Sequence, residues 1–275
     1  MTQHFPLKAR YTQQPPPGLA TLRARGYVDA GGKVAPKRYF AFYVGDFDTP
    51  SWLWLWMPLF WTDPARGQVP LSWAFDPNLS LRAGPAMVWT RQTATANDSF
   101  VAGDSGAGYL NPGALEEPRA PGLPSGMDLW AAHCKRFYRQ WDIQVTGFII
   151  EGNAPAMKAH GLDAYRRFSP GGIVGQKLLA QAVIGGLPVK GMDTDLPNGV
   201  QASADIIRNS MFSPPGGVPQ FKVARAVWHP PSWYKAVVDR VRASDATQGP
   251  IEIVDLRTLL RLMARYESGR TGAQA

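Results

Sequence analysis

Short apolar segments alternate with longer amphipathic segments along most of the chain. The segment Tyr39-Phe40-Ala41-Phe42-Tyr43-Val44-Gly45 is typical of the first kind: short, almost continuously apolar and followed by acidic and turn-forming residues. Such segments indicate buried β-strands, whose two faces are both covered. We predict strands at residues 39–45, 69–75, 99–102, 145–150, 187–192, 221–228 and 251–254.

The segments between these strands favour helices. We expect them near residues 51–61, 80–91, 126–141, 154–165, 202–209, 232–243 and 255–266. In the last of these, Leu256, Leu259, Leu260 and Met263 form one apolar stripe, and Asp255 precedes the first turn as a helix N-cap. Repeated alternation of strand and helix predicts an α/β fold with parallel strands and right-handed crossovers. The pattern does not decide between a closed barrel and an open sheet.

The two ends of the chain differ from this pattern. Residues 1–37 are rich in proline and glycine, which predicts an irregular arm or linker, whereas residues 38–267 form the β/α domain and 268–275 a disordered tail. Residues 1–10 lack the apolar core of a signal peptide, although an exported longer form is possible, so localisation stays open. The apolar run 52–61 is half the length of a membrane span, and we expect no membrane insertion.

Composition limits the function classes further. The chain has 275 residues, 45% of them hydrophobic, which is enough for one large core. Its net charge of +8 comes from 29 Lys and Arg that are scattered along the sequence. Nucleic-acid binders concentrate such charge on one face or helix, so we expect a solvated basic surface and no nucleic-acid partner.

The cysteine and histidine content argues against metal and thiol chemistry. Cys134 is the one cysteine, and it lies within a predicted helix beside His133, which points about 100° away around the helix axis. The four histidines show no HExxH or HxH spacing. We therefore predict a structural cysteine, no zinc site and no cofactor.

Acidic side chains follow several predicted strands directly. Asp46 and Asp48 follow the first strand, Glu151 follows the strand at 145–150, and Asp193 and Asp195 follow the strand at 187–192. Because the carboxyl ends of parallel strands meet at one face, we expect these acids to lie on one rim, together with His229. For Asp193 and Asp195 a polar turn is the simpler interpretation.

Asp46 and Asp48 have the spacing needed for paired carboxylate chemistry. In an extended chain, residues i and i+2 project to the same side, with Cα atoms roughly 6.6 Å apart. This separation suits cleavage of a glycosidic bond by two carboxyl groups. The alternative is that both aspartates cap the following helix or pair with arginines.

The loop 103–112 is the second candidate part of a site. Its glycines allow positive φ angles or a close approach to a ligand, although glycine and proline clusters are also ordinary turns. We expect this loop to line a substrate site through Asp104, Ser105, Gly106, Gly108, Tyr109 and Asn111. Asp104 could instead satisfy loop amides, and Tyr109 could pack under the glycines.

Ten tryptophans suit carbohydrate binding, because sugar rings present flat C–H faces to aromatic rings. Four of them fall in the segment 52–61, where core packing is the default interpretation. We expect Trp52, nearest to the aspartates, to face a sugar, and Met57 and Phe60 to be buried.

These motifs, in this order, give the chain a family resemblance. The segment Asp46-Phe47-Asp48-Thr49-Pro50-Ser51-Trp52, the turn 73–79 and the motif Gly106-Ala107-Gly108-Tyr109 after Asn97-Asp98-Ser99-Phe100 resemble the GxGYxYP family of putative glycoside hydrolases. The resemblance covers residues 38–267 and implies the family's C-terminal domain, a seven-stranded parallel β/α barrel similar to a TIM barrel. It also implies an N-terminal partner domain and an active cleft between the two parts.

The resemblance carries a catalytic set. It implies that Asp46 and Asp48 belong to that set, together with a glutamate upstream that has no counterpart in residues 1–37, where Asp29 is the one acid. Asn111 also replaces the second tyrosine of the motif. Within this chain we take Glu151 as the substitute proton donor, because apolar neighbours at the end of its strand would raise the pKa of its carboxyl.

Two hypotheses of different classes follow. The first is a glycoside hydrolase that cleaves a poly- or oligosaccharide with Asp46, Asp48 and Glu151. The second is a non-catalytic or truncated carbohydrate-binding barrel that lacks its N-terminal partner domain. Hydrolysis abolished by Asp46→Asn supports the first hypothesis, and binding without turnover supports the second.

Overall fold

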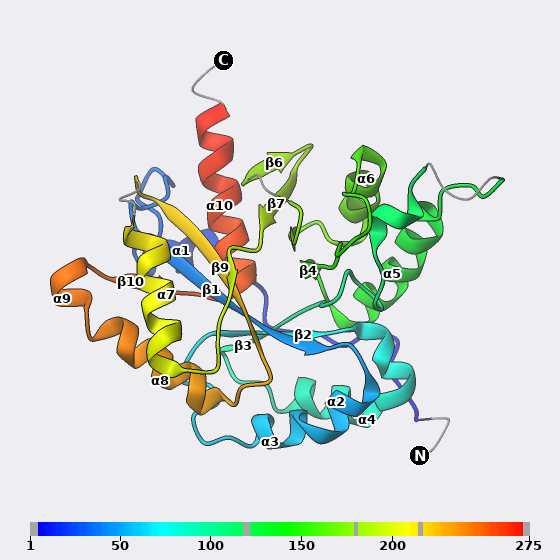
Figure 1. Cartoon of the computed structure of the whole chain (residues 1–275), viewed down its shortest axis with the longest axis horizontal. Coiled ribbons are helices and arrows are strands. Elements are labelled where there is room, and N and C mark those ends of the chain that lie inside the picture. Colours follow the sequence, from blue (N-terminus) through cyan, green and yellow to red (C-terminus); the bar gives the residue numbers. More distant parts are fainter. Residues whose placement is uncertain (1–4, 118–121, 179–180, 214–216, 272–275) are drawn as a thin grey trace.

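The protein is built on two sheets flanked by helices (Figure 1). We analysed a computed structural model, which describes residues 5–117, 122–178, 181–213 and 217–271. The larger sheet has the strand order β3-β2-β1-β9-β8, with β10 also paired to β1, and its strands are all parallel. They are β1 (Arg38–Phe47), β2 (Leu71–Phe75), β3 (Asp98–Val101), β8 (Thr194–Asp195), β9 (Gln220–Val227) and β10 (Ile251–Ile253).

The smaller sheet has the order β4-β5-β7-β6. Its strands are β4 (Val145–Ile149), β5 (Gly172–Gly175), β6 (Ala182–Ile184) and β7 (Leu187–Gly191), and the β6–β7 pair is antiparallel. The two sheets meet where Ala102, directly after β3, forms a bridge to Thr146 of β4. There the Ala102 N–H donates to the Val145 carbonyl at 3.0 Å, and the Gly147 N–H donates to the Ala102 carbonyl at 2.7 Å.

The mixed α/β class with parallel strands is confirmed, but the closed seven-stranded barrel is not found in the described residues. The strands divide into two sheets, and β1 has three partners instead of two: β9 along most of its length, β10 at its start and β2 near its end. This arrangement is possible because β10 is three residues long and covers only Arg38–Phe40 of β1. The sequence pattern also omitted β5, whose four residues Gly172–Gly175 include two glycines.

Most helices lie where the amphipathic segments predicted them (Figure 1). In the view of Figure 1, α2, α3 and α4 lie together below the larger sheet, α5 and α6 flank β4, and α7 and α8 lie on the opposite side. The helices are α1 (Leu19–Ala24), α2 (Pro50–Leu55), α3 (Met57–Trp61), α4 (Ser80–Gln92), α5 (Met127–Trp141), α6 (Ala159–Phe168), α7 (Val200–Phe212), α8 (Pro231–Arg242), α9 (Asp245–Gln248) and α10 (Leu256–Thr271), with short 3₁₀ turns η1 (Pro77–Leu79) and η2 (Pro112–Leu115). None of the helices in the described ranges is long and apolar enough to span a bilayer.

Both ends of the chain contain more structure than the sequence suggested. The N-terminal segment holds α1 and packs on the domain: Tyr11 stacks on Trp141 with ring centroids 4.3 Å apart, and the Gln13 amide bonds both the N–H and the carbonyl of Phe100. At the other end, α10 continues to Thr271 into the predicted tail, whose residues 272–275 lie outside the described part. Asp255 caps α10 as predicted, accepting the N–H groups of Arg257 and Thr258.

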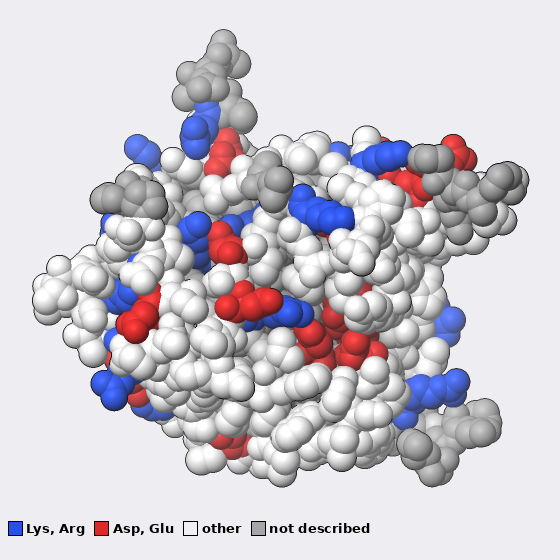
Figure 2. All heavy atoms as spheres, viewed as in Figure 1, with Lys and Arg blue, Asp and Glu red and all other residues white. Residues whose placement is uncertain are grey.

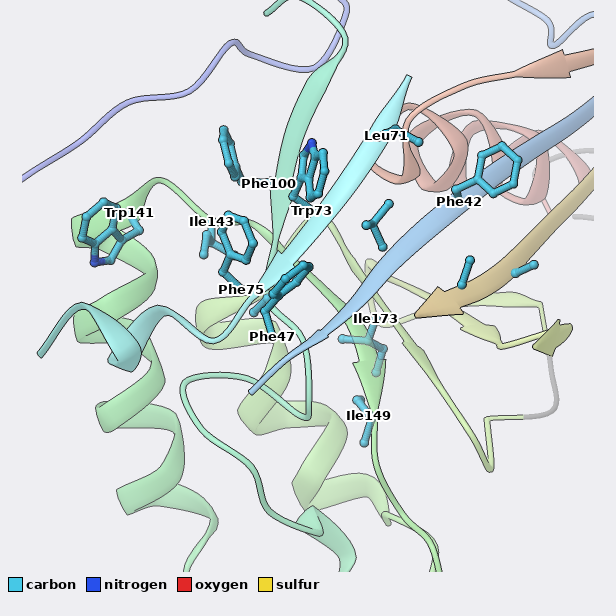
Figure 3. Close-up of a cluster of buried hydrophobic side chains, with 14 of the residues drawn as sticks. Phe42, Phe47, Leu71, Trp73, Phe75, Phe100, Trp141, Ile143, Ile149 and Ile173 are labelled. Atoms are coloured by element: carbon cyan, nitrogen blue, oxygen red, sulfur yellow. The ribbon is translucent and has the colours of Figure 1, made fainter. Parts of the chain in front are cut away.

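Aromatic side chains fill the core beneath the ends of β1 and β2 (Figure 3). Phe47 and Phe75 pack edge to face with centroids 5.1 Å apart, and Trp73 stands beside both rings. All three side chains are at least 98% buried. Because a close-packed interior leaves side chains in single rotamers, this cluster fixes the positions of the residues that immediately follow the two strands.

Asp98 connects this core to the loop before β3. Its buried carboxylate accepts hydrogen bonds from the Trp73 indole at 2.8 Å, from Arg66 at 2.6 Å and from both the N–H and the hydroxyl of Thr95 at 2.8 Å. These donors compensate the cost of burying the charge. Without the Asp98 carboxylate, the Arg66 guanidinium and the Trp73 indole N–H would lose their hydrogen-bond acceptor.

We expect Asp98→Ala to lower the free energy of unfolding by roughly 3–5 kcal/mol, because one partner of a buried ion pair is lost. Urea denaturation measures the change. The matched control is Asp239→Ala, whose ion pair with Lys235 is exposed to solvent and should contribute less than about 1 kcal/mol. Equal, small losses in the two variants would contradict the structural role of Asp98.

Candidate active site

The end of β1 presents two aspartates on one side. Asp46 and Asp48 are half-buried, whereas Phe47 between them is completely buried in the aromatic core. This alternation agrees with the extended conformation that the i, i+2 spacing required. Arg225 of β9 donates to Oδ2 of Asp46 at 3.0 Å, whereas Oδ1 of Asp46 and Oδ1 of Asp48 have no hydrogen-bond partner in the described part of the chain.

Two further aspartates follow β2 and β3. Asp76 comes directly after β2, and Asp104 lies three residues beyond the end of β3. Both side chains are completely buried, and none of their four carboxyl oxygens has a hydrogen-bond partner among the described residues. Buried polar groups are nearly always bonded, so this concentration of unpaired oxygens marks a place where a ligand or solvent belongs.

The four carboxyl groups interact electrostatically, which places them in one site. Burial, and then the neighbouring Asp46 and Asp48, raise the pKa of Asp104 to about 8, against the opposing effect of Arg225. Burial raises the pKa of Asp76 well above its usual range, and the charges of Asp104, Asp48 and Asp46 add to this effect. The value for Asp104 means that the protonated form predominates at neutral pH, and the pKa of Asp76 is raised in the same direction.

Asp46 and Asp48 stay closer to ordinary carboxylates. Burial raises the pKa of Asp46, and Arg225 partly offsets this rise by stabilising the charged form. Burial also raises the pKa of Asp48, against hydrogen bonds from the backbone and from the Trp52 side chain. Asp46 is thus the carboxyl group of the site that a paired cation stabilises in its charged form, whereas burial raises the pKa of Asp104 to about 8.

Tyr43 of β1 lies beneath this cluster. Its side chain is completely buried, its hydroxyl has no partner within the described residues, and burial together with the charge of Asp104 raises its pKa. Glycines make room for it, because a Cβ at Gly103 would stand 2.7 Å from the hydroxyl and a Cβ at Gly147 would stand 2.7 Å from the ring. These glycines allow β3 and β4 to close around the tyrosine.

The glycine-rich loop holds Asp104 in place mainly through buried contacts. Asp104 and Ser105 have positive φ angles of 47° and 82°, which non-glycine residues rarely adopt. The Ser105 hydroxyl accepts the Ile150 N–H at 2.9 Å, and Gly106 packs against Trp130 and Cys134. Ser105 and Gly106, which we expected to contact substrate, therefore support the loop from inside the fold.

The remainder of the loop faces the surface or braces it. Tyr109 is 59% exposed, and its pKa is raised by burial and then by Asp104, Asp48 and Asp46, so it borders the acids. Gly108 lies against the Asn78 amide, with a φ of 132°. The Asn111 amide, oriented to satisfy its neighbours, donates to the carbonyls of Ile150 and Glu151 at 3.1 Å and so ties the loop to β4.

Glu151, the predicted acid catalyst, lies inside the fold and connects two loops. Its side chain is completely buried, and its two carboxyl oxygens accept N–H groups from Met157 at 3.0 Å and from Lys177 at 2.7 Å. These two hydrogen bonds fix the loops that contain Met157 and Lys177. The role of Glu151 as the acid catalyst stays a prediction.

Two aromatic side chains border the acids at the surface. Trp52, in the first turn of α2, is partly buried against the core, and its ring lies 4.3 Å from that of Trp228, which follows β9. Trp228 donates its indole N–H to the Asp46 carbonyl at 3.1 Å. Met57 and Phe60, by contrast, are buried as predicted.

The other sequence candidates have structural roles. Asp193 pairs with Lys190 and Lys222, and Asp195 pairs with Arg225. His229 stacks on Trp233, and Cys134 is buried in α5, where its thiol accepts the Ala107 N–H. Across the described ranges, no group of three or more His, Cys, Asp or Glu side chains is arranged to hold a metal ion.

Asp76 and Trp228 were missed as site residues. The signal for Asp76 was the one that identified Asp46, an acid immediately after a buried strand, but the following proline indicated only a turn. Trp228 was included in a predicted strand.

Figure 2 shows acidic side chains gathered near the centre of one face, with a basic side chain beside them and mostly uncharged surface around them.

Fold and site together define a parallel α/β domain that collects carboxyl groups at the carboxyl ends of its strands. Residues 36–263 match the model of the GxGYxYP putative glycoside hydrolase C-terminal domain. The chain belongs to this family. Among curated proteins, none matches the sequence.

Solved structures share the fold at low sequence identity. A "putative hydrolase" from Bacteroides thetaiotaomicron aligns with a TM-score of 0.65 and 15% identity, covering 84% of this chain and 46% of that one. The chain thus spans less than half the length of that hydrolase. More distant are an uncharacterized protein from Agrobacterium tumefaciens (TM-score 0.47, 16% identity, 90% and 99% coverage) and a peptidoglycan N-acetylglucosamine deacetylase (TM-score 0.43, 11% identity, 82% and 88% coverage).

Asp104 should make the stability of the fold depend on pH. Its pKa in the folded protein, about 8, is above the unfolded value of about 4, so its contribution is fully present below pH 4 and lost as the pH rises to 8. We expect Asp104→Asn to raise the free energy of unfolding, relative to the unsubstituted protein, by roughly 4–5 kcal/mol more at pH 8 than at pH 4, measured by urea denaturation. An equal change at both pH values would show that Asp104 ionises normally.

Proposed function

We propose that this domain hydrolyses glycosidic bonds by carboxylate acid–base catalysis. The observation that carries the proposal is the buried, unpaired Asp104 carboxyl, protonated at neutral pH, beside Asp46 and Asp48. Family membership supports a carbohydrate substrate, since the family is described as one of glycoside hydrolases. The hydrolase-like fold of the most similar of the three structures agrees with this class of reaction.

Each carboxyl group has one task in this mechanism. The buried Asp104 carboxyl gives its proton, through one intervening water molecule, to the glycosidic oxygen as the bond to the anomeric carbon breaks, and a second water molecule attacks that carbon. Asp46 or Asp48 accepts the proton that this second water loses. Arg225 stabilises the charged form of Asp46 through its bond to Oδ2 at 3.0 Å, and Oδ1 has no partner among the described residues.

Asp76 affects the electrostatics of the site without taking part in proton transfer. Burial raises its pKa well above the usual range, which favours the uncharged form beside Asp104. An ionised Asp76 would raise the pKa of Asp104 still further and make it a poor proton donor. We therefore assign Asp76 a positioning and electrostatic role.

A second candidate function is carbohydrate binding without cleavage. It is favoured by the length comparison, since more than half of the similar hydrolase structure lies outside the matched region. If an essential group of that enzyme lies in the unmatched part, this domain would hold the sugar while another domain completes the site. The two functions share the same aromatic and acidic surface and differ only in turnover.

A panel of chromogenic glycosides and polysaccharides tests the proposal. We expect hydrolysis by the unsubstituted chain and a loss of about 10²–10⁴-fold in kcat/KM for both Asp104→Asn and Asp46→Asn, because each removes one proton-transfer group. Glu151→Gln should retain the activity of whatever fraction folds. Asp239→Asn, on the exposed surface of α8, is the matched control and should change nothing.

The outcomes separate the two functions. Binding of a glycan with no turnover of it would replace the hydrolase proposal with the binding function. Turnover that survives Asp104→Asn but is abolished in folded Glu151→Gln would restore Glu151 as the proton donor.

A further inference from the structure

Trp228 is held in a strained conformation at the edge of the acidic cluster. Its φ angle is 57°, a region that bulky residues avoid, and such strain persists where the surrounding structure imposes it. Two hydrogen bonds impose it here: the backbone N–H donates to the Gly45 carbonyl and the indole N–H to the Asp46 carbonyl, both at 3.1 Å. With these bonds made, 38% of the residue is still exposed.

Trp52 and Tyr109 lie beside the same acids from two other segments. The Trp52 ring is inclined at 42° to that of Trp228, with centroids 4.3 Å apart, so the two indoles make one continuous aromatic surface. Trp52 also hydrogen-bonds Asp48. Tyr109, on the glycine-rich loop, is more than half exposed. Burial and then the charges of Asp104 and Asp48 raise the pKa of its hydroxyl.

Other exposed aromatic residues lack these connections. Trp54, in α2, and Trp56, between α2 and α3, are 45% and 37% exposed, and Trp56 stacks only on Phe60 in the described structure. Neither has a described hydrogen bond or ion pair with an acid of the site. Exposure alone therefore does not distinguish Trp228, whereas its bonds to β1 do.

The charge around the aromatic surface is negative. Asp46, Asp48 and Asp195 lie within one network, and Arg225 is the cation that pairs with Asp46 and Asp195. The partly exposed carboxyl groups of Asp46 and Asp48 can only accept hydrogen bonds while ionised. A ligand that reaches them must donate hydrogen bonds, and an anionic ligand would be repelled.

We propose that Trp52, Trp228 and Tyr109 form a sugar-binding subsite next to the carboxyl groups, selective for glycans made of neutral or amino sugars and closed to uronic acid and sulfated glycans. Sugar rings would stack on the indole faces while their hydroxyl or ammonium groups donate to Asp46 and Asp48. This selectivity rests on the proposed carbohydrate function of the site. It differs from what the net charge of +8 alone would favour, which is binding of anionic polymers.

The test is binding to a glycan array that carries neutral, amino-sugar, uronic acid and sulfated oligosaccharides. We expect bound glycans in the first two classes only. For the strongest of them, measured in solution by calorimetry, Trp228→Ala should weaken binding about tenfold or more, and Trp54→Ala less than twofold. Asp48→Asn should reduce the advantage of amino sugars over neutral ones, and added salt should do the same in the unsubstituted protein.

The results distinguish this inference from the hydrolase proposal. Glycan binding that depends on Trp228 without any turnover supports the subsite and overturns hydrolysis. Hydrolysis with a KM that is unchanged by Trp228→Ala overturns the subsite and leaves catalysis standing. Binding confined to uronic acid or sulfated glycans, or no binding at all, overturns the inference.

Discussion

The close approach of four aspartates at the ends of three neighbouring parallel strands is the constraint on which the site depends. The strands β3, β2 and β1 are adjacent and parallel, so the residues that follow them must share one edge. Phe47, Phe75 and the other buried rings fix each strand end, and the carboxyl groups cannot separate without disrupting that core. Unpaired buried carboxyls destabilise a fold, and the large aromatic core offsets their cost.

Protonation reduces the electrostatic repulsion between these neighbouring carboxyl groups. The pKa of Asp104 is raised to about 8 and that of Asp76 well above its usual range, and Arg225 balances the charge of a third acid, Asp46. The same compromise creates the chemical asymmetry that the proposed reaction uses: a proton donor beside proton acceptors, in a site bordered by aromatic rings. The buried carboxyl groups therefore lower the stability of the fold while they supply reactive groups, a combination that is common at functional sites.

Local patterns predicted the elements well and their partners less well. The strand at 39–45 and the helices near 126–141 and 232–243 were identified from apolar runs and amphipathic spacing, because these signals lie within single segments. The division into two sheets was not predictable, since the triple pairing of β1 depends on β10, which is distant in sequence. For the site, Asp46 and Asp48 were identified as acids that follow a buried strand, and Asp104 as part of the glycine-rich loop. The backbone partners of Glu151, which are Met157 and Lys177, could not be predicted because they are fixed only by the folded loops.

Infrared spectroscopy of the carboxyl groups tests the central claim most directly. The C=O stretch of a protonated carboxylic acid is separate from the bands of a carboxylate, so a difference spectrum between the unsubstituted protein and Asp104→Asn isolates one side chain. The account predicts a protonated Asp104 band at pH 7 that disappears with a midpoint near pH 8. A difference spectrum that contains only carboxylate bands down to about pH 5 would contradict it.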